Sequence, residues 1–273
     1  MPCPEVSSLL LEHDKNLLRV SINRPKMRNA LSAEVVAELQ TVCTFLEVSP
    51  DISAVVLRGA EGTFCAGGDI SSFRQAMEPA PASPQDDPLA KSNRSFGDFL
   101  LRFNALPQTT IAVVEGAAIG GGMGLVCTAD IVLALADTRF GLSETRLGVI
   151  PAQIAPFVVA RLGLATTRRI ALTGMRMRGT EAKAIGLVDA IFNDTDALEA
   201  ETVRYIGEIS QCGPRANAAT KALLLNIDKA PVEAVLDQGA QAFAVALRGE
   251  EAREGIAAFL GKRKPAWTEK NHE

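Results

Sequence analysis

The sequence predicts an α/β protein in which a β/α core, residues 1–195, precedes a helical C-terminal region, residues 196–273. Three observations lead to this prediction. Short apolar runs typical of buried strands alternate with segments of helical periodicity, two of these runs lead into glycine-rich loops, and the last part of the chain keeps a helical periodicity throughout. At 273 residues the chain is long enough for one sizeable α/β domain with a helical appendage.

The first predicted elements are a β-hairpin, a helix and a buried strand. Two β-rich runs, residues 6–11 and 17–23, flank a polar turn at residues 13–16. Ser32 is a candidate N-cap for the helix that follows, because apolar residues then recur at helical spacing. Residues 52–58 predict a buried strand, and the loop GAEGTFCAGGD comes directly after it.

A second unit of strand, glycine loop and helix follows. Residues 77–88, rich in Pro, Ala, Ser and Asp, predict a surface loop, and residues 95–106 predict a helix ended by Pro107. Residues 111–114 predict a second buried strand, after which AAIGGGMGLVCTAD runs from a glycine turn into a helix. A third strand is predicted at residues 131–136.

The rest of the chain is mainly helical in pattern. From residue 196 the helical periodicity continues to Leu260, with breaks at Gly213-Pro214 and Ala230-Pro231 and no internal repeat of fixed period. Before it, helices are predicted at 157–162, 166–172 and 180–185, with a last short strand at 187–192.

Composition excludes several classes of protein. Hydrophobic residues at 47% and charged residues at 22% are ordinary globular usage, which argues against global disorder. A net charge of −4 gives no general attraction to nucleic acid or to anionic membranes, and no apolar run is long enough to span a bilayer. The N-terminus lacks the pattern of a secretion signal. Five dispersed cysteines without CxxC spacing favour reduced thiols over disulfides or zinc, so we expect a cytoplasmic protein with no metal site.

Five stretches, in this order, resemble the crotonase (enoyl-CoA hydratase/isomerase) superfamily over nearly the whole chain. The resemblance implies a crotonase-type ββα spiral core with a C-terminal helical trimerisation region. It also implies an acyl-CoA substrate whose coenzyme A is part of the substrate, so that no separate cofactor is expected. The stretches are NRPKMRNALS at 23–32, GTFCAGGDI at 62–70, VEGAAIGGGMGLVCTADI at 114–131, FGLSETRLGVIPA at 140–152 and GIAAFLGKRKP at 255–265.

The two glycine motifs suit the chemistry of a thioester. Addition to an enoyl thioester places negative charge on the thioester oxygen, so the site must offer hydrogen-bond donors there. Backbone N–H groups serve only where a ligand can approach the chain closely, which favours glycine. The family places these two donors at positions that match Gly68 and Gly121, and the second position also opens a helix whose positive end favours an enolate. The alternative is that both glycine runs are tight turns after buried strands.

Only one of the family's two catalytic glutamates is present. Glu144, in FGLSE, matches the second position, whereas Gly124 stands at the first, so a two-carboxylate mechanism cannot be transferred. One carboxylate with a raised pKa can take a proton from water and return it to the α-carbon. The alternative for Glu144 is a helix-start residue with Ser143 as N-cap. Space at Gly124 would admit a bulky or branched acyl group, or one that bears its own carboxylate.

The continuation TRLGVIPAQIAPFVVARLG resembles the single-glutamate branch that hydrates isohexenylglutaconyl-CoA and methylglutaconyl-CoA, and the pairing with GGMGL resembles the isohexenylglutaconyl-CoA hydratases of acyclic terpene breakdown. We therefore expect hydration of a branched, carboxylated 2-enoyl-CoA. Alternatives on the same scaffold are isomerisation or decarboxylation of an acyl-CoA. An alternative of another class is a non-catalytic scaffold that binds RNA or a protein, which the acidic balance disfavours.

Two basic segments are candidates for coenzyme A binding. Arg24, Lys26 and Arg28 could meet its phosphates or form a solvated basic turn. Crotonases usually form trimers paired into hexamers whose last helices lie beside a neighbour's coenzyme site, so Phe259 and Lys262 are candidates there; an exposed basic tail is the alternative. The resemblance adds Met27, Ala66, Gly68, Asp69 and Ile70 as coenzyme-binding positions, with helix capping as the alternative for Asp69.

Three other readings have little support. His13 and His272 lie in polar terminal segments, which disfavours a histidine triad or a histidine metal site. Cys65 is interpreted as a small packing residue rather than a nucleophile. The glycine run lacks the Lys-Ser/Thr of a phosphate-binding loop, and no GxGxxG dinucleotide motif is present.

Overall fold

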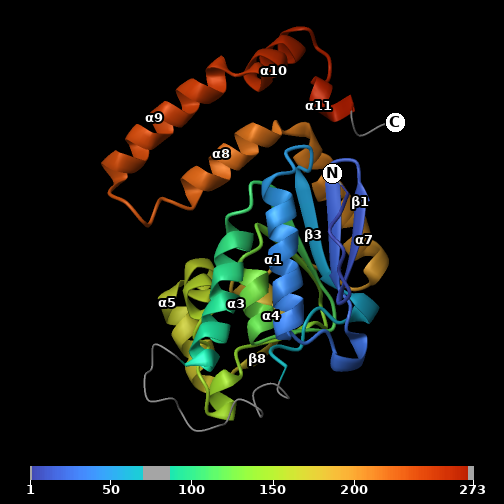
Figure 1. The fold of residues 1–273 in the computed structure, drawn as a ribbon, viewed down its shortest axis with the longest axis vertical. Helices are drawn as coiled ribbons and strands as arrows, with labels where there is room; N and C mark the ends of the chain where they lie inside the picture. The colour runs from blue at the N-terminus through green and yellow to red at the C-terminus, as the bar shows by residue number, and fades with distance from the viewer. Residues whose placement is uncertain (1, 70–86, 270–273) are drawn as a thin grey trace.

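The structure is a computed structural model that describes residues 2–69 and 87–269. Figure 1 shows a body of strands and helices, with helices of the C-terminal region lying across one end of it. Of these, α8 (Pro214–Leu224), α9 (Val232–Arg248) and α10 (Glu250–Leu260) are referred to below as the C-terminal arm. The predicted α/β class is confirmed. No helix in the described ranges is long and apolar enough to cross a membrane.

A mixed six-stranded sheet forms the centre of the body. Its spatial order is β1-β2-β3-β4-β6-β9, with β1 antiparallel to β2 and every other pair parallel. The predicted hairpin is confirmed, since Leu9 pairs with Ile22 and Asp14 with Leu17. The strands are β1 (Leu9–Asp14), β2 (Leu17–Ile22), β3 (Ala54–Gly59), β4 (Thr109–Val114), β6 (Ile131–Leu135) and β9 (Ala190–Phe192).

Helices cover both faces of this sheet, which explains why its inner strands are apolar without interruption. Successive side chains of β3 point to opposite faces: Val55 and Leu57 join the large core cluster, and Val56 joins a second cluster. Helix α1 (Ala33–Glu47) contributes to the first cluster with α3 (Pro88–Asn104), and α7 (Thr195–Gln211) to the second. The predicted N-cap of α1 is confirmed, because the Ser32 hydroxyl accepts a hydrogen bond from the Val35 amide at 3.3 Å.

A second, three-stranded sheet lies beside the first and carries the glycine loops. Its strands are β5 (Ala117–Ile119), β7 (Arg139–Gly141) and β8 (Arg176–Arg178). The sequence analysis did not predict them, because each is short and forms by pairing with a distant segment. Two single bridges extend this sheet, Cys65 with Ala118 and Leu31 with Gly68. The chain thus winds from one sheet to the other and back, as expected for a spiral core.

Two predicted helices have different limits in the structure. Helix α3 begins seven residues before the predicted start, because Asp87 caps it by accepting a hydrogen bond from the Leu89 amide (2.8 Å) and Pro88 fills the first position. Of the predicted loop 77–88, residues 77–86 lie outside the described residues. Helix α5 (Ala155–Thr173) joins two predicted helices across a kink at Gly163. The remaining elements are η1 (Pro25–Met27), η2 (Ala60–Gly62), α4 (Gly121–Cys127), η4 (Glu144–Leu147), α6 (Gly179–Ala184) and α11 (Ala266–Glu269).

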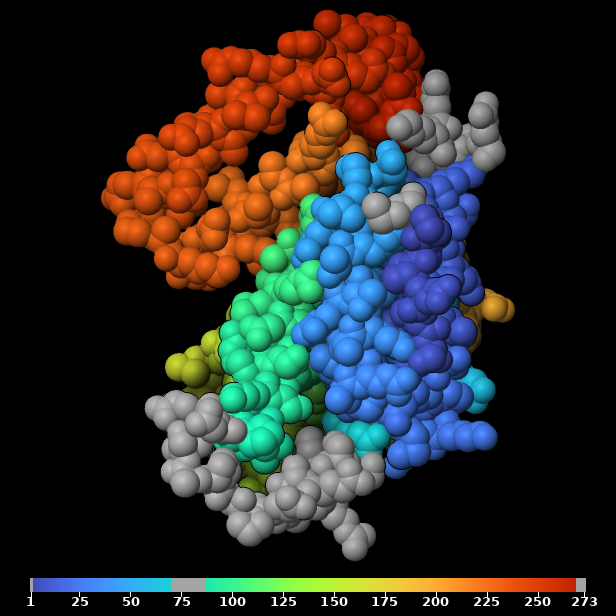
Figure 2. All heavy atoms as spheres, in the orientation of Figure 1, coloured from blue at the N-terminus to red at the C-terminus, as the bar shows by residue number. Residues whose placement is uncertain are grey.

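The helices after residue 195 differ in their packing. Helix α7 contacts strands β3, β4, β6 and β9 and buries Leu198 and Ile209 against them. The C-terminal arm starts only after α7, at the predicted break Gly213-Pro214. In the space-filling view of Figure 2, α9 and α10 form an outer rim, with an opening between them and α8. The boundary at residue 195 stays a prediction, but the part that stands apart from the sheet begins with α8.

Candidate active site

The turn Gly120–Gly122 has other parts of the chain packed directly against it. Gly120 has φ 54°, and a methyl group there would lie 3.0 Å from Oε1 of Glu144. A methyl group at Gly122 would lie 2.7 Å from the carbonyl oxygen and 2.8 Å from Cβ of Cys65. Side chains are therefore excluded at both positions. The turn thus lies between the Glu144 carboxyl and the loop that begins with Cys65.

The second glycine loop is oriented by two backbone ladders. Cys65 exchanges hydrogen bonds with β5, donating to Ala117 (2.8 Å) and accepting from Ile119 (3.0 Å). The amide of Leu31 donates to the Gly67 carbonyl (2.8 Å) and its carbonyl accepts from the Asp69 amide (3.0 Å). In a parallel ladder this pattern turns the N–H of the residue between, Gly68, away from Leu31. That orientation depends on Gly67, whose φ of 106° favours glycine.

The amides of Gly68 and Gly121 are available to a ligand. Neither donates a hydrogen bond to any group in the described part of the chain. Gly121 is the first residue of α4, where backbone N–H groups have no partner within the helix. Both residues are half-buried, whereas Gly67, Asp69, Gly120 and Gly122, their immediate neighbours, are buried. The two predicted donors are thus more accessible than the residues on either side of them.

Glu144 places its carboxyl against the glycine turn. It is the first residue of the short helix η4, with Ser143 at the N-cap position, as the helix-start alternative expected, but the Ser143 side chain makes no capping hydrogen bond. Its Oε2 is buried and has no hydrogen-bond partner within the described residues. Burial raises the pKa of Glu144, opposed in part by the backbone N–H groups of Glu144 and Ser143. A carboxyl group with a raised pKa and a free oxygen is suited to proton transfer.

The space expected at Gly124 is filled in this structure. A methyl group at Gly124 would lie 2.1 Å from Cγ2 and 2.5 Å from Cβ of Ile154, a residue only 3% exposed. The interpretation of Gly124 as a vacancy that directly admits a branched acyl group is therefore wrong. The residue that fills this space comes from the start of α5, and sequence reasoning could not find it because nothing in the sequence links positions 124 and 154.

The loop before α1 separates the predicted cations into two groups. Arg24 pairs with Asp69 at 3.2 Å and donates to the Ala30 carbonyl at 2.8 Å, so its guanidinium links this loop to the end of the Gly68 loop. Lys26 and Arg28 are exposed and have no ion-pair partner among the described residues. These two, rather than Arg24, are the cations free to meet phosphate groups.

A buried asparagine that the sequence analysis did not single out holds the same loop. Asn29 is 0% exposed, has φ 55°, and accepts a hydrogen bond from the Arg24 amide at 2.8 Å. Its side-chain amide donates to the carbonyls of Ala60 (2.9 Å) and Thr63 (2.6 Å). Asn29 therefore ties the basic loop to the chain that leads into Gly68. An asparagine at the end of a predicted turn was the available sign, since asparagine tolerates positive φ.

The other predicted coenzyme positions differ in their setting. Met27 is 46% exposed and lies at the tip of the basic loop. The amide of Ala66 donates to the Arg28 carbonyl at 3.0 Å, so it is not free for a ligand. Asp69 is buried in its ion pair with Arg24, while Ile70 and the helix that Asp69 was expected to cap lie outside the described residues.

The C-terminal candidates do not join this site within one chain. Phe259 is 83% exposed near the end of α10, and Lys262 follows in the exposed turn. In Figure 1, α10 lies at the opposite end of the molecule from β8, which belongs to the sheet beside the glycine loops. Any contact of these residues with a coenzyme site therefore requires another chain.

Cys65 is fully buried in the loop that leads to Gly68. Burial raises the pKa of the Cys65 thiol to about 12, which agrees with its interpretation as a packing residue.

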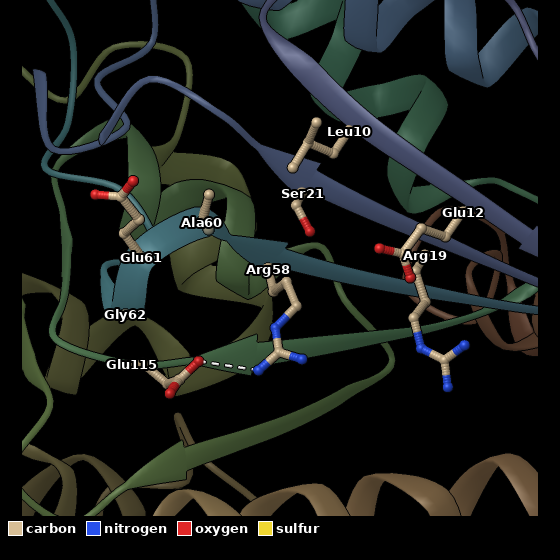
Figure 3. A pocket seen from close by; sticks show the side chains of 10 residues that line it. Leu10, Glu12, Arg19, Ser21, Arg58, Ala60, Glu61, Gly62 and Glu115 are labelled. Carbon is tan, nitrogen blue, oxygen red and sulfur yellow. Dashed lines mark hydrogen bonds and ion pairs between the residues drawn. The ribbon is translucent and has the colours of Figure 1, made fainter. Parts of the chain in front are cut away.

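A cavity of about 250 Å³ opens beside β1, β2 and β3, and Figure 3 shows Arg58 in it pointing to Glu115. Arg58 pairs with both Glu115 (3.0 Å) and Glu199 (3.2 Å), so this cation is neutralised. None of the predicted site residues lines this cavity.

Comparison with known proteins agrees with this geometry. Residues 12–270 match the family model described as enoyl-CoA hydratase/isomerase. The structure superposes on Pseudomonas aeruginosa AtuE with a TM-score of 0.91 and 46% identity, covering 96% of this chain and 100% of the other. It superposes on an enoyl-CoA hydratase/isomerase from Marinobacter aquaeolei with a TM-score of 0.93 and 44% identity, covering 96% and 99%.

A curated relative extends the comparison to sequence. The mevalonyl-coenzyme A hydratase of Beauveria bassiana is 30% identical over 260 residues, covering 92% of this chain and 91% of the relative. The family model, the solved structures and this relative each span nearly the full length of the chain. The expected spiral core is thereby confirmed, and the chain belongs to the enoyl-CoA hydratase/isomerase family of the crotonase superfamily.

Proposed function

We propose that this protein is a hydro-lyase that adds water across the C2–C3 double bond of a 2-enoyl-CoA. The observation that carries the proposal is the placement of the Glu144 carboxyl against a glycine turn whose Gly121 amide has no acceptor in the described residues, with the Gly68 loop packed on the same turn through Cys65. Family membership supports an acyl-CoA as the substrate. The reaction uses no cofactor beyond the coenzyme A that the substrate carries.

The residues divide the reaction between them. The amides of Gly68 and Gly121 donate hydrogen bonds to the thioester oxygen, where negative charge develops as water attacks C3. The Glu144 carboxylate takes a proton from that water, and the resulting carboxylic acid then protonates C2 as the enolate collapses. The raised pKa of Glu144 helps it to hold the proton between these steps. Losing one amide donor would cost about 3–4 kcal/mol of transition-state stabilisation.

The coenzyme is assigned to the basic loop. Lys26 and Arg28 bind its phosphates, and the backbone around Met27, Ala66, Asp69 and Ile70 lines the adenine and pantetheine, as the family resemblance implies. The exposed, unpaired state of the two cations within the described residues supports this assignment. Replacing both by alanine should raise KM for the acyl-CoA by roughly 30-fold and leave KM for a pantetheine thioester unchanged, since each of the two phosphate contacts is worth about 1 kcal/mol.

The acyl group is assigned to the branched, carboxylated 2-enoyl class, with isohexenylglutaconyl-CoA or methylglutaconyl-CoA as the first candidates. The single carboxylate at Glu144 and the motif from Thr145 to Gly163 support this class. The 30% identical relative is a hydratase of mevalonyl-CoA, a thioester that is likewise branched. Because hydrocarbon of Ile154 occupies the space at Gly124, the branch must lie elsewhere in the pocket.

The assembly is assigned as a homotrimer or a dimer of trimers in the cytoplasm. The C-terminal arm exposes many apolar side chains, which a second and third copy of the chain can cover. In that arrangement Phe259 and Lys262 lie beside a neighbour's coenzyme. All five cysteines are unpaired, which suits a reducing compartment. Nucleic acid and membranes are not expected as partners, given the net charge of −4.

The test is turnover of isohexenylglutaconyl-CoA, methylglutaconyl-CoA and crotonyl-CoA, followed by mass spectrometry of the products. Hydration adds the mass of water, isomerisation leaves the mass unchanged and decarboxylation loses that of carbon dioxide. Brisk hydration of crotonyl-CoA without turnover of the branched substrates would remove the substrate class. Isomerisation is the second candidate, because a lone carboxylate suffices for a proton shuttle. Binding of acyl-CoA without any turnover would instead indicate a non-catalytic scaffold.

A further inference from the structure

One buried side chain outside the glycine loops occupies the face of α4 where two-glutamate relatives carry their other carboxylate. Ile154 is 3% exposed and precedes the first residue of α5. Its Cγ2 and Cβ lie 2.1 Å and 2.5 Å from the position that a methyl group at Gly124 would take. The branched side chain of Ile154 therefore fills the space that a side chain at position 124 would take.

This contact is next to the carboxyl group of the site. The Gly124 amide donates to the carbonyl of Gly120, the N-cap of α4, at 3.0 Å, so the first turn of α4 links the two glycines. Glu144 packs against Gly120, and Ile154 packs against Gly124. The side chains of Glu144 and Ile154 therefore both pack against the first turn of α4 and its N-cap. The free Oε2 of Glu144 is consistent with an apolar neighbour.

We propose that Ile154 is a specificity-determining residue, which forms the apolar wall of the acyl site beside Glu144 and closes the place of a second carboxylate. The inference rests on the proposed function, since it assigns a wall to that acyl site. A wall of this kind discriminates by length and shape, because one methylene more or less in an apolar pocket changes kcat/KM by about 10–200-fold.

The first experiment measures the Gly124–Ile154 contact without any substrate. Gly124→Ala is made in the unchanged protein, in Ile154→Ala and in Ile154→Gly, and melting temperatures are compared. Because the nearest atom of residue 154 recedes from 2.1 Å to 2.5 Å to 3.6 Å in this order, the loss caused by Gly124→Ala should decrease stepwise from about 3–10 °C toward none. Gly207→Ala, in α7 with open space at its Cβ, is the matched control and should show no such dependence.

The second experiment measures acyl preference. Ile154→Ala should shift the ratio of kcat/KM for longer over shorter enoyl-CoA chains by about 10-fold or more toward the longer chains, and Ile154→Val should shift it less in the same direction. Ile170→Ala, an equally buried truncation later in α5, should lower stability but leave the ratio unchanged.

The outcomes distinguish a failure of the role of Ile154 from a failure of the proposed function. An equal loss in all three backgrounds, or an unchanged acyl preference in an active Ile154→Ala enzyme, would overturn the role of Ile154 while the proposed function stands. An unmodified protein that turns over no enoyl-CoA would overturn both. A stepwise loss together with a shifted preference would establish the proposal.

Discussion

The core and the C-terminal arm of this protein differ in how far they bury their apolar side chains. In the core, Leu18, Leu57 and Val114 are fully buried between the sheet and its helices. In the arm, α8 and α9 bury no residue completely, and Val245 is 74% exposed. Other half- or mostly exposed apolar residues of this part are Leu224, Ile227, Val232, Leu236, Phe243, Leu247, Ile256, Phe259 and Leu260.

This difference indicates that the two regions depend on different contacts. The core contains the glycine loops and Glu144, and its own packing places them. The arm is anchored to the body at a few polar points, such as Lys221 Nζ donating to the Gln108 carbonyl (3.1 Å) and to Asp130 (2.7 Å). Its apolar surface would find its partners in other chains. Chemistry would then belong to the core, and assembly to the arm.

The strongest test of this division is a substitution that removes the acid/base group and leaves the assembly unchanged. Glu144→Gln should lower kcat by roughly 10²–10⁴, because the amide side chain cannot accept and return a proton. Binding of acyl-CoA and the assembly state should persist, since the side chain keeps its size. Glu233→Gln on α9 is the matched control and should retain full kcat. Undiminished turnover by Glu144→Gln would show that the acid/base group is misassigned. Steady-state kinetics and calorimetric binding supply both readouts.

A pair of identical truncations compares the packing of the two regions. Leu57→Ala in β3 should cost about 2–5 kcal/mol of unfolding free energy, because it leaves a cavity in a fully buried cluster. Leu236→Ala on α9, 67% exposed in one chain, should cost about 0.5 kcal/mol or less in dilute protein. Urea unfolding at low protein concentration measures both. Similar losses would mean that the arm and the core form one packing unit.

The assembly can be perturbed without changing the glycine loops or Glu144. Phe259→Asp should weaken association by about 10-fold or more, because a charge replaces an apolar side chain in the proposed interface. Sedimentation over a range of protein concentrations gives the mass. Leu101→Asp, on an exposed position of α3, is the control for an added charge and should leave the mass unchanged. An unaltered assembly in Phe259→Asp would place the interface elsewhere.

The smallest predicted effect is the pH dependence of stability that Glu144 brings. Burial raises its pKa above the ordinary 4.5, so the folded state holds this proton more tightly than the unfolded state. The stability that results is complete below pH 4.5 and is lost as the pH rises through the raised pKa. The melting temperature of Glu144→Gln relative to the parent should therefore rise from acidic to neutral pH. A difference that falls over this interval would contradict a raised pKa.

Local signals in the sequence predicted many elements because their causes are local. Ser32 caps α1, and the glycine–proline pair at 213–214 separates α7 from α8. The early start of α3 was also encoded, by Asp87 before Pro88, but a composition typical of a loop obscured it. Strands β5, β7 and β8 were missed, because each forms only through pairing with distant segments.

The sequence by itself determined the α/β class, the order of the glycine loops and the presence of one carboxylate where the family has two. The tertiary structure decided which of these residues act on one another. It brought Glu144 against Gly120, paired Arg24 with Asp69, and filled the space at Gly124 with Ile154. The physical reason is that glycine motifs and caps act within a few residues, whereas packing depends on which distant side chains the fold brings into the same space.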